Sequence, residues 1–482
     1  MPANETSLLI RNGILVLPSG IGRVDVLCVD GRVHSLIEQG RTINAENVIE
    51  AEGHLVFPGF IDPHVHSRDP GQVHKEDFYH STLGALVGGV TTVLEMPNAI
   101  PPVTDAALFE ERAAAHEPNA WVDFGLWGLA LGAENLGELP GLFEAGAVAV
   151  KLFWGYALDR ETKQLVYSLP SNDRDVIEPP DNGDVFEICA AVAASGGVLG
   201  VHCEDQALLR AAQARTDGSV TDYGDLLATR PSIAESAAIA LGSELSRATG
   251  CRFHVVHLSS KDGVEAVRAA RQRGVPITAE TCPHYLTLTK EAYEHIGPVM
   301  KVFPPIRGVE DQEALWDGIR DGVVVSVGSD HAPHTEEERS LPLDRQPPGM
   351  VGVETLGPLL VNEMLKGRIT PEQLAFLVSE STARLYGLYP RKGAITPGAD
   401  ADFTIVDPEG ETSISNASLH AKNPLSAWDG VVTAGRITAT ICRAEVRVRD
   451  GEIFGEPSGR LVRSGHSIAE RNELVPGRVG GA

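Results

Sequence analysis

The stretch Phe57-Pro58-Gly59-Phe60-Ile61-Asp62-Pro63-His64-Val65-His66-Ser67-Arg68 runs from an apolar segment into a group of polar side chains. Alternate residues of an extended segment point to the same side of the chain. His64 and His66 are therefore expected to face one way, so that both imidazoles can reach one metal ion. Ordinary core or surface histidines produce the same spacing, so this pattern needs support from the rest of the chain.

Further residues of ligand type follow other apolar runs in the same way. A His or Asp at such a position can bind a metal ion directly, and a Lys can do so once it is modified. Because chance rarely repeats one arrangement five times, the repetition favours a shared metal site over unrelated polar residues. The additional candidates are Lys151, His202, His257 and Asp330.

The middle of the chain alternates between strand-like and helix-like segments. Segment 106–116 carries an Ala/Glu/Arg pattern, 232–248 has Ala and Leu at helical spacing, and 205–214 and 262–272 are interpreted as helices too. Strands that alternate with helices pair in parallel, and eight of them predict a closed (β/α)8 barrel. The candidate ligands then fall at the carboxyl ends of the strands, where such barrels carry their active sites. The eight predicted strands are 55–66, 91–96, 121–127, 147–153, 198–203, 252–258, 276–282 and 323–330.

Both ends of the chain have a different character. Residues 6–55 and 394–454 contain alternating apolar and polar runs with Asn-Gly and Asp-Gly turn signals. We predict that 1–55 and 394–455 pair into one small β-sandwich, and that 56–393 form the catalytic barrel. The polar, Gly-rich tail 456–482 has the composition of either an extended arm or a disordered segment.

Bulk composition excludes several classes of protein. The net charge of −26 over 482 residues argues against nucleic acid, which requires a basic footprint, and disfavours anionic membrane surfaces. No apolar run is long enough to span a membrane. The N-terminus lacks the pattern of a signal peptide, and the six cysteines show no disulfide-framework spacing. A cytoplasmic location is therefore expected.

The number of candidate ligands indicates two metal ions. A catalytic zinc site uses three protein ligands and keeps one position open, so five ligands are too many for one ion. Two ions would use all five if an anion bridged them. A lysine in a barrel mouth of low polarity can lose its proton and add carbon dioxide, which makes a carbamate with two oxygens. We therefore expect two Zn²⁺ ions per chain bridged by carboxylated Lys151; the simpler alternative is that Lys151 pairs with an acid.

The ordered set His64, His66, Lys151, His202, His257 and Asp330 resembles that of the amidohydrolase superfamily. Within it, the chain is similar to the cyclic amidohydrolases, namely dihydroorotase, hydantoinase (dihydropyrimidinase) and allantoinase. The similarity covers about residues 6 to 455 and includes the segments 58–62, 88–92, 281–286 and 398–402. It implies a binuclear zinc barrel with a carboxylated lysine and a β-sandwich built from both chain ends.

The expected reaction is the hydrolytic opening of a small cyclic amide. A hydroxide held between two zinc ions would attack the ring carbonyl, because metal binding lowers the pKa of water toward 7. Asp330 would accept the proton and pass it to the leaving nitrogen. The bland alternative for Asp330 is a turn-forming residue before His331.

Several motifs are similar to those of dihydroorotases. Arg68 completes a His-x-His-x-Arg pattern in which the resemblance assigns Arg to the substrate carboxylate, and Asn98 matches the same group. The segment 330–334, Asp-His-Ala-Pro-His, matches it as well, and His284 and His334 would help to hold the substrate. The main expectation is thus a dihydroorotase, which interconverts dihydroorotate and N-carbamoyl-aspartate. A rim ion pair with a neighbouring acid, Asp69 or Glu76, is the alternative role for Arg68.

Other motifs favour the alternative, a hydantoinase (dihydropyrimidinase) or an allantoinase. Segment 151–156 looks like the hydantoinase pattern Lys-x-Phe-x-x-Tyr, whose Tyr hydroxyl, here Tyr156, stabilises the oxyanion. Phe303 stands where dihydroorotases commonly have Asn, and Trp154 and Phe303 would line an apolar pocket or simply pack at the rim. Segments 294–298 and 419–424 also read as hydantoinase-like. A non-catalytic scaffold relative and a metallohydrolase acting on phosphoesters or acyclic amides are weaker alternatives. The resemblance implies a homo-oligomer, a dimer or a tetramer.

Overall fold

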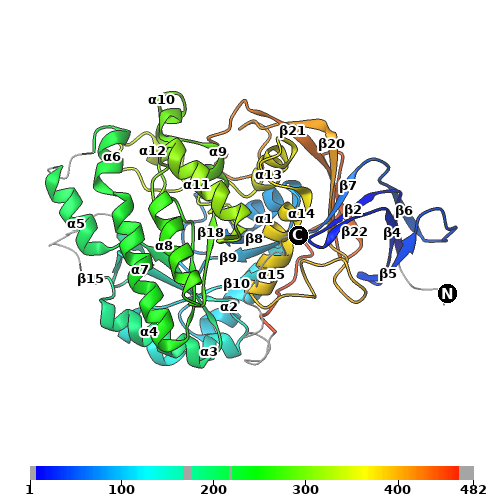
Figure 1. Cartoon of the computed structure of the whole chain (residues 1–482). Helices are drawn as coiled ribbons and strands as arrows, with labels where there is room; N and C mark the ends of the chain where they lie inside the picture. Colours follow the sequence, from blue (N-terminus) through cyan, green and yellow to red (C-terminus); the bar gives the residue numbers. More distant parts are fainter. Residues whose placement is uncertain (1–6, 167–174, 217–219, 466–482) are drawn as a thin grey trace.

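The computed structural model describes residues 7–166, 175–216 and 220–465 of the chain. Its larger part is a barrel of parallel strands surrounded by helices, and its smaller part is a β-sandwich beside it (Figure 1). This confirms the predicted fold class. None of the helices in the described ranges is long and apolar enough to cross a membrane.

Eight strands form the barrel, and each pairs in parallel with its neighbours. The last strand meets the first through a parallel bridge between Val65 and His331, and the His66 N–H donates to the His331 carbonyl at 2.8 Å. The short strand β11 (Gly128–Leu129) extends β10 toward β12. The barrel strands are β8 (Phe60–Val65), β9 (Val90–Glu95), β10 (Asp123–Leu126), β12 (Val150–Trp154), β16 (Val198–Cys203), β17 (Arg252–Val255), β18 (Ile277–Thr281) and β19 (Val324–Val327).

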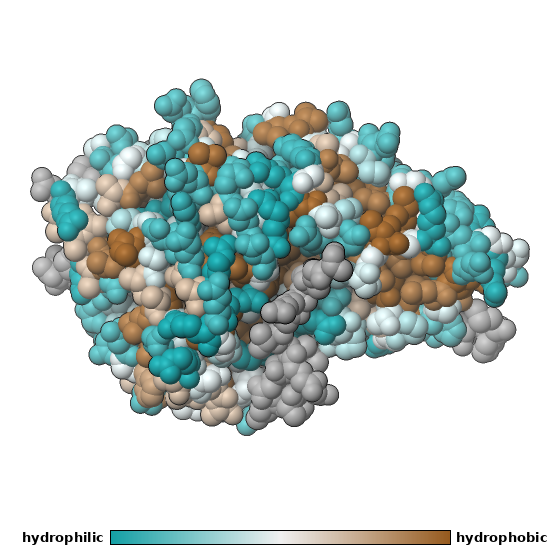
Figure 2. All heavy atoms as spheres, in the orientation of Figure 1, coloured by the Kyte–Doolittle hydropathy of each residue, from teal (hydrophilic) through white to brown (hydrophobic). Residues whose placement is uncertain are grey.

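Helices cover the barrel and connect its strands, and they turn mostly hydrophilic residues to solvent on the face that Figure 2 shows. The predicted helical segments are confirmed as α2, α5, α7 and α8. The α-helices are α1 (Phe78–Val87), α2 (Ala106–His116), α3 (Leu139–Glu144), α4 (Asn182–Ala194), α5 (Gln206–Arg215), α6 (Tyr223–Thr229), α7 (Ser232–Thr249), α8 (Lys261–Gln272), α9 (Pro283–Thr287), α10 (Tyr293–Ile296), α11 (Val309–Arg320), α12 (Glu336–Arg339), α13 (Leu356–Leu365), α14 (Pro371–Ala375) and α15 (Ser381–Leu385).

Local capping explains where several of these helices begin and end. Aspartates cap α1, α2 and α5, because the side chains of Asp77, Asp105 and Asp205 accept hydrogen bonds from backbone N–H groups of the first turn. Gly250 ends α7 in the left-handed region, with φ of 76°. These signals are local, which is why the sequence alone predicts the helices well.

The predicted first strand, 55–66, is divided in the structure. Its first part, β7 (Leu55–Pro58), pairs with β2 and β20 of the β-sandwich, and only β8 belongs to the barrel. Gly59 separates them where the backbone passes close to its neighbours: a Cβ here would lie 2.2 Å from the Thr91 hydroxyl. The domain boundary predicted at residue 55 thus falls at the start of β7, and the sandwich sheet continues to Pro58.

The β-sandwich combines both ends of the chain. One sheet has the order β5-β4-β1-β6 and the other β23-β22-β21-β20-β7-β2-β3. Apolar residues from both sheets, including Leu8, Val26, Phe403 and Ile441, form a common core. The strands are β1 (Ser7–Arg11), β2 (Ile14–Leu17), β3 (Gly20–Gly22), β4 (Val24–Val29), β5 (Arg32–Glu38), β6 (Asn47–Glu50), β20 (Phe403–Ser413), β21 (Val432–Cys442), β22 (Glu445–Arg449) and β23 (Glu452–Ile453).

The chain after the sandwich returns to the barrel. The Phe124 N–H donates to the Arg460 carbonyl at 3.0 Å, and the Val462 N–H donates to the Phe124 carbonyl at 2.7 Å. The Val462 side chain is 1% exposed and packs among residues of the barrel core. Residues 456–465 of the predicted tail therefore form an ordered contact with β10, whereas 466–482 lie outside the described residues.

A buried ionic cluster joins the two domains. The ammonium of Lys392 lies 2.5 Å from an Asp123 carboxylate oxygen, 2.6 Å from one of Asp402 and 3.1 Å from one of Asp400. Burial alone would lower the pKa of Lys392, but the three carboxylates raise it above its ordinary value. The three carboxylates lie close enough together to bind a metal cation, but the Lys392 ammonium is the cation that they contact. This contact explains the Gly398-Ala399-Asp400-Ala401-Asp402 motif.

Lys392→Met is expected to destabilise the protein by about 3–5 kcal/mol, because it leaves the buried Asp402 carboxylate without a cation, whereas Asp123 and Asp400 are still paired with Arg443 and Arg391. Urea unfolding followed by circular dichroism measures this change. The matched control is Lys261→Met, which removes an ammonium that lies 3.9 Å from a Glu310 carboxylate oxygen at the surface, where both side chains are exposed, and its expected effect is below about 1 kcal/mol. Equal stability of the two variants would contradict the interpretation.

Candidate active site

A cavity at the carboxyl ends of the barrel strands collects most of the predicted site residues. It is lined by His64, His66, Arg68, Asn98, Lys151, Tyr156, His202, His257 and Asp330, together with Phe153, Leu165, Phe303, Ala332, Pro348 and Gly349. The predicted residues His284 and His334 do not line it. The side chains that line the cavity meet there because the carboxyl ends of all the parallel strands lie at the same end of the barrel.

One group of three ligand atoms forms at β8 and the segment after β19. His64 Nε2 lies 3.4 Å, and His66 Nε2 lies 3.3 Å, from the same Asp330 carboxylate oxygen. The opposite nitrogen of each ring is already engaged: His64 Nδ1 is 2.6 Å from Glu280 and His66 Nδ1 is 2.7 Å from the Asn98 side-chain oxygen. With the protons on Nδ1, the Nε2 lone pairs face Asp330, which is an arrangement suited to a divalent ion.

A second pair of ligand atoms comes from β16 and the end of β17. His202 Nδ1 lies 3.0 Å from His257 Nε2, and His202 Nε2 lies 2.8 Å from a Glu204 carboxylate oxygen. Burial lowers the pKa of His202 and holds that of His257 well below its ordinary value, so both rings are neutral near pH 7. A cation between them would receive both lone pairs.

Lys151 lies within this cavity on β12. Its side chain is fully buried, and its ammonium nitrogen has no hydrogen-bond partner among the described residues. No carboxylate of the described residues pairs with it, so the ion-pair alternative finds no support. Burial lowers the pKa of Lys151 to about 8, which makes the neutral amine accessible. The residues present therefore fit a carboxylated lysine beside two divalent ions.

The carboxylates behind the histidines were not predicted from the sequence. Glu280 is buried in β18 and also contacts His254 Nε2 at 3.3 Å, while Glu204 directly follows β16. A charged residue in an otherwise uncharged strand is a usable signal, because burying a charge is costly unless it has a partner. That signal identifies Glu280 within Ile277–Thr281, but it does not name the partner.

Three residues of the site have left-handed backbone conformations. The φ angles are 60° at Arg68, 40° at His257 and 48° at Asp330. Non-glycine residues rarely adopt this region, and such strain is found where function requires a particular side-chain direction. At each position the strand has just ended, so the turn aims the side chain into the cavity.

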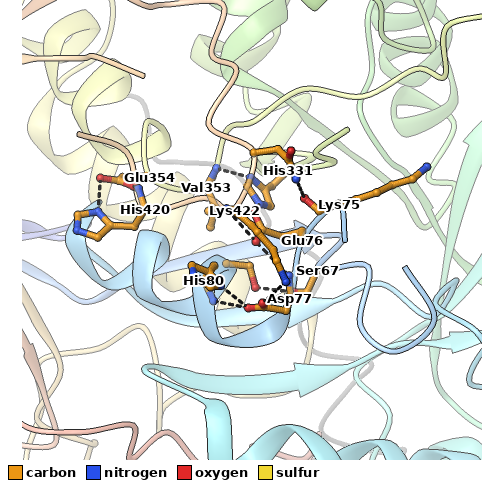
Figure 3. A network of polar contacts seen from close by, with 12 residues as sticks. Ser67, Lys75, Glu76, Asp77, His80, His331, Val353, Glu354, His420 and Lys422 are labelled. Carbon is orange, nitrogen blue, oxygen red and sulfur yellow. Dashed lines mark hydrogen bonds and ion pairs between the residues drawn. The ribbon is translucent and has the colours of Figure 1, made fainter. Parts of the chain in front are cut away.

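Contacts from His331 support the Asp330 segment. Its Nδ1 accepts hydrogen bonds from the backbone N–H groups of Gly352 and Val353, at 3.1 and 3.3 Å, and its Nε2 faces Glu76 at 3.4 Å. Figure 3 shows that Glu76 is also approached by Lys422, whose backbone N–H lies 3.2 Å from each carboxylate oxygen. Segment 419–424, identified in the sequence as hydantoinase-like, thus contacts the mouth of the barrel through Glu76.

Arg68 lines the cavity without an acidic partner among the described residues. Neither Asp69 nor Glu76 pairs with it; its nearest polar contact is His334 Nε2, at 3.4 Å. His334 lies behind Arg68 and contacts Glu338 at 3.1 Å. His284 is also buried away from the cavity, and burial lowers its pKa to about 4.

Aromatic residues form another wall of the cavity. Phe303 lines it, and the Arg230 guanidinium carbon lies 3.5 Å from the centre of its ring. The Tyr156 hydroxyl donates to Glu204 at 3.4 Å. Trp154, by contrast, packs in the barrel core and does not line the cavity.

Comparisons with known proteins agree with this arrangement. The model of the amidohydrolase family matches residues 55–175 and 199–462. An allantoinase of Rubrobacter xylanophilus is 36% identical, over 96% of this chain and 99% of the relative. An L-hydantoinase of Paenarthrobacter aurescens is 32% identical, over 93% and 96%. The solved structure of an L-hydantoinase (dihydropyrimidinase) from Arthrobacter aurescens superposes with a TM-score of 0.88 at 32% identity, over 95% and 99%.

Proposed function

Because the chain belongs to the amidohydrolase family, we propose that it opens the ring of a cyclic ureide of the hydantoin or allantoin type by metal-dependent hydrolysis. The observation that carries the proposal is the convergence of two groups of ligand atoms, on His64, His66 and Asp330 and on His202 and His257, around the buried amine of Lys151.

In this proposal His64, His66 and Asp330 would hold one divalent ion, His202 and His257 would hold the other, and carboxylated Lys151 would supply a further anionic ligand. Bound ions of this kind make water more acidic and polarise a carbonyl, and zinc suits these nitrogen and oxygen ligands. Burial lowers the pKa of His66, His202 and His257, which favours metal binding because a protonated ring offers no lone pair at that nitrogen.

Proton movement falls to Asp330. Hydrolysis of a ring amide requires that a proton leave the attacking water and reach the departing ring nitrogen. Although burial acts to raise the pKa of Asp330, the neighbouring His64 and His66 hold it well below its ordinary value, so the carboxylate is ionised and can accept that proton. The left-handed turn at Asp330 directs the carboxylate toward the cavity, where it can deliver the proton again.

Tyr156 is the candidate donor to the oxygen of the attacked carbonyl. It lines the cavity beside Lys151, and its long 3.4 Å hydrogen bond to Glu204 is easily exchanged for one to a developing negative charge. Phe153, Leu165 and Phe303 supply apolar surface against the ring and its substituent.

The relatives named as allantoinase and L-hydantoinase support this substrate class over the dihydroorotase expected first from the sequence. The deciding experiment assays the Zn²⁺-loaded protein against allantoin, hydantoin, 5-substituted hydantoins, dihydrouracil and dihydroorotate. We expect turnover of allantoin or of hydantoins, with dihydroorotate as a poor substrate. Preferred turnover of dihydroorotate would restore the first expectation, and no turnover of any ring would refute the proposed class.

Arg68 favours a second candidate, a substrate with a carboxylate. A buried guanidinium without an acidic partner is suited to an anionic group of the ligand. For dihydroorotate, or for a hydantoin whose 5-substituent carries a carboxylate, Arg68→Met is expected to cost about 2–4 kcal/mol, roughly thirty- to a thousandfold in kcat/KM. Hydantoin itself should change far less.

The matched control for this prediction is Arg368→Met, which removes a surface guanidinium that pairs with Glu313 away from the cavity. It should leave kcat/KM unchanged for neutral and anionic rings alike. If Arg68→Met affects neutral and anionic rings equally, Arg68 supports the cavity wall and does not bind a carboxylate.

A further inference from the structure

Glu204 is a buried carboxylate that no step of the proposed reaction uses. It is fully buried directly after β16, and one of its oxygens receives three donors. These are His202 Nε2 at 2.8 Å, the Tyr156 hydroxyl at 3.4 Å and a guanidinium nitrogen of Arg230. Tyr156 and Arg230 are distant from Glu204 in the sequence, whereas His202 lies two residues before it, and both Tyr156 and His202 line the cavity.

The contact with His202 determines which ring nitrogen carries the proton. A carboxylate beside Nε2 holds the proton there, so that the lone pair is on Nδ1, the atom that lies 3.0 Å from His257 Nε2. Without an acceptor at Nε2, the ring would be free to move its proton to Nδ1 or to rotate. Partners of this kind orient metal-binding histidines and raise their basicity.

Arg230, which pairs with Glu204, also contacts aromatic residues in the wall of the cavity. The Arg230 guanidinium carbon lies 3.5 Å from the centre of the Phe303 ring and 5.4 Å from the centre of the Tyr156 ring. Arg230 is itself 2% exposed, so its charge is compensated inside the protein by Glu204. The carboxylate, the cation and the two rings thus form one packed unit behind the second ligand pair.

We propose that Glu204 is a positioning residue that aligns His202 for metal binding and holds Tyr156 and, through Arg230, Phe303 in place around the substrate. The inference rests on the proposed function in that His202 is taken to bind a metal ion. Tyr156 releases Glu204 when a ring carbonyl becomes the better acceptor, whereas His202 remains bound to it.

The test measures metal affinity separately from activity. Glu204→Asp keeps the negative charge beside Arg230 but shortens the side chain, so the carboxylate no longer reaches His202 Nε2. With the purified full chain loaded with Zn²⁺ and titrated with a chelator, we expect one of two ions to be lost at about 10- to 100-fold lower chelator strength than in the wild type. The absorption spectrum of the Co²⁺-loaded variant should change as well, because the geometry at one ion is altered.

Glu235→Asp is the matched control. Glu235 is equally buried and accepts hydrogen bonds from Ser259 and Ser260, but it contacts none of the proposed ligands. A purely structural role for Glu204 would lower the unfolding temperature of both variants and leave Zn²⁺ affinity and the Co²⁺ spectrum unchanged; that result overturns the proposal.

Glu204→Gln replaces the Asp variant in this titration if that variant does not fold, because glutamine keeps the length of the side chain and removes its charge. It should release the same ion more readily than the wild type, and wild-type affinity would count against the proposal. A wild-type protein that binds two ions but opens none of the cyclic ureides refutes the proposed substrate class and leaves the role of Glu204 intact. Loss of one ion from Glu204→Asp at lower chelator strength, with wild-type Zn²⁺ affinity in Glu235→Asp, supports the positioning role.

Discussion

Asp330→Asn is expected to lower kcat by about 10²- to 10⁴-fold, the usual contribution of a positioned acid–base group. The amide keeps the shape of the side chain, but it cannot accept the proton that must reach the ring nitrogen. It is also a weaker ligand beside His64 and His66, whose Nε2 atoms lie 3.4 and 3.3 Å from the carboxylate oxygen. Steady-state kinetics at saturating substrate, with metal content determined on the same sample, provide the measurement.

The fold should survive this substitution, because Asp330 lies at the mouth of the barrel and not in its core. An unchanged unfolding temperature would show this. The control is Asp321→Asn, which alters an exposed carboxylate paired with Arg268. Near-normal turnover of Asp330→Asn would mean that another group moves the proton.

Lys151→Ala is expected to reduce both metal content and activity. The activity should fall by more than about 100-fold, which exceeds the effect of losing a residue that only supports a metal ligand. The physical reason is that, in the proposed site, the carbamate would supply an anion to two cations that otherwise repel each other. Part of the activity should return on addition of acetate or propionate, whose carboxylate can enter the space left by the side chain. Native mass spectrometry of the wild type should detect the added mass of carbon dioxide.

Lys290→Ala removes an exposed lysine and is the control for this experiment. A wild-type chain with unmodified Lys151 and no more than one bound ion would refute the binuclear arrangement. Failure of carboxylic acids to restore any activity, with both ions still bound in Lys151→Ala, would instead show that Lys151 acts as an amine.

Much of the site could be predicted because its ligands obey a local rule. Each follows an apolar run, and parallel strands of a barrel end at the same side, so His64, Lys151, His202 and Asp330 had to meet once the fold was right. The roles of Asn98 and His334 could not be predicted in this way. Asn98 contacts the back of His66, and His334 supports Arg68 from behind, which depends on side-chain directions that sequence spacing does not encode.

The division of the segment 55–66 shows the same limit for the fold. Its apolar run predicts one long strand, but the chain leaves the sandwich sheet at Pro58 and enters the barrel at Phe60. The break at Gly59 results from close approach of Thr91 and Asp402, which are distant in sequence. The return of residues 456–465 to β10 likewise depends on a backbone edge that only the assembled barrel presents.

The sequence by itself determined the succession of strands and helices, the composite β-domain and the order of the proposed metal-binding residues, because each depends on periodicity and on short spacing. Only the tertiary structure decided which carboxylate stands behind which histidine. Glu280 meets His64 from another strand of the barrel, and Glu204, two residues after His202, meets that ring through the directions of the two side chains. The tertiary structure also decided that, among the residues that the structure describes, no carboxylate pairs with Arg68 or with Lys151. Burial and pairing depend on the neighbours that folding brings together, and these neighbours control the charge and direction of every group in the cavity.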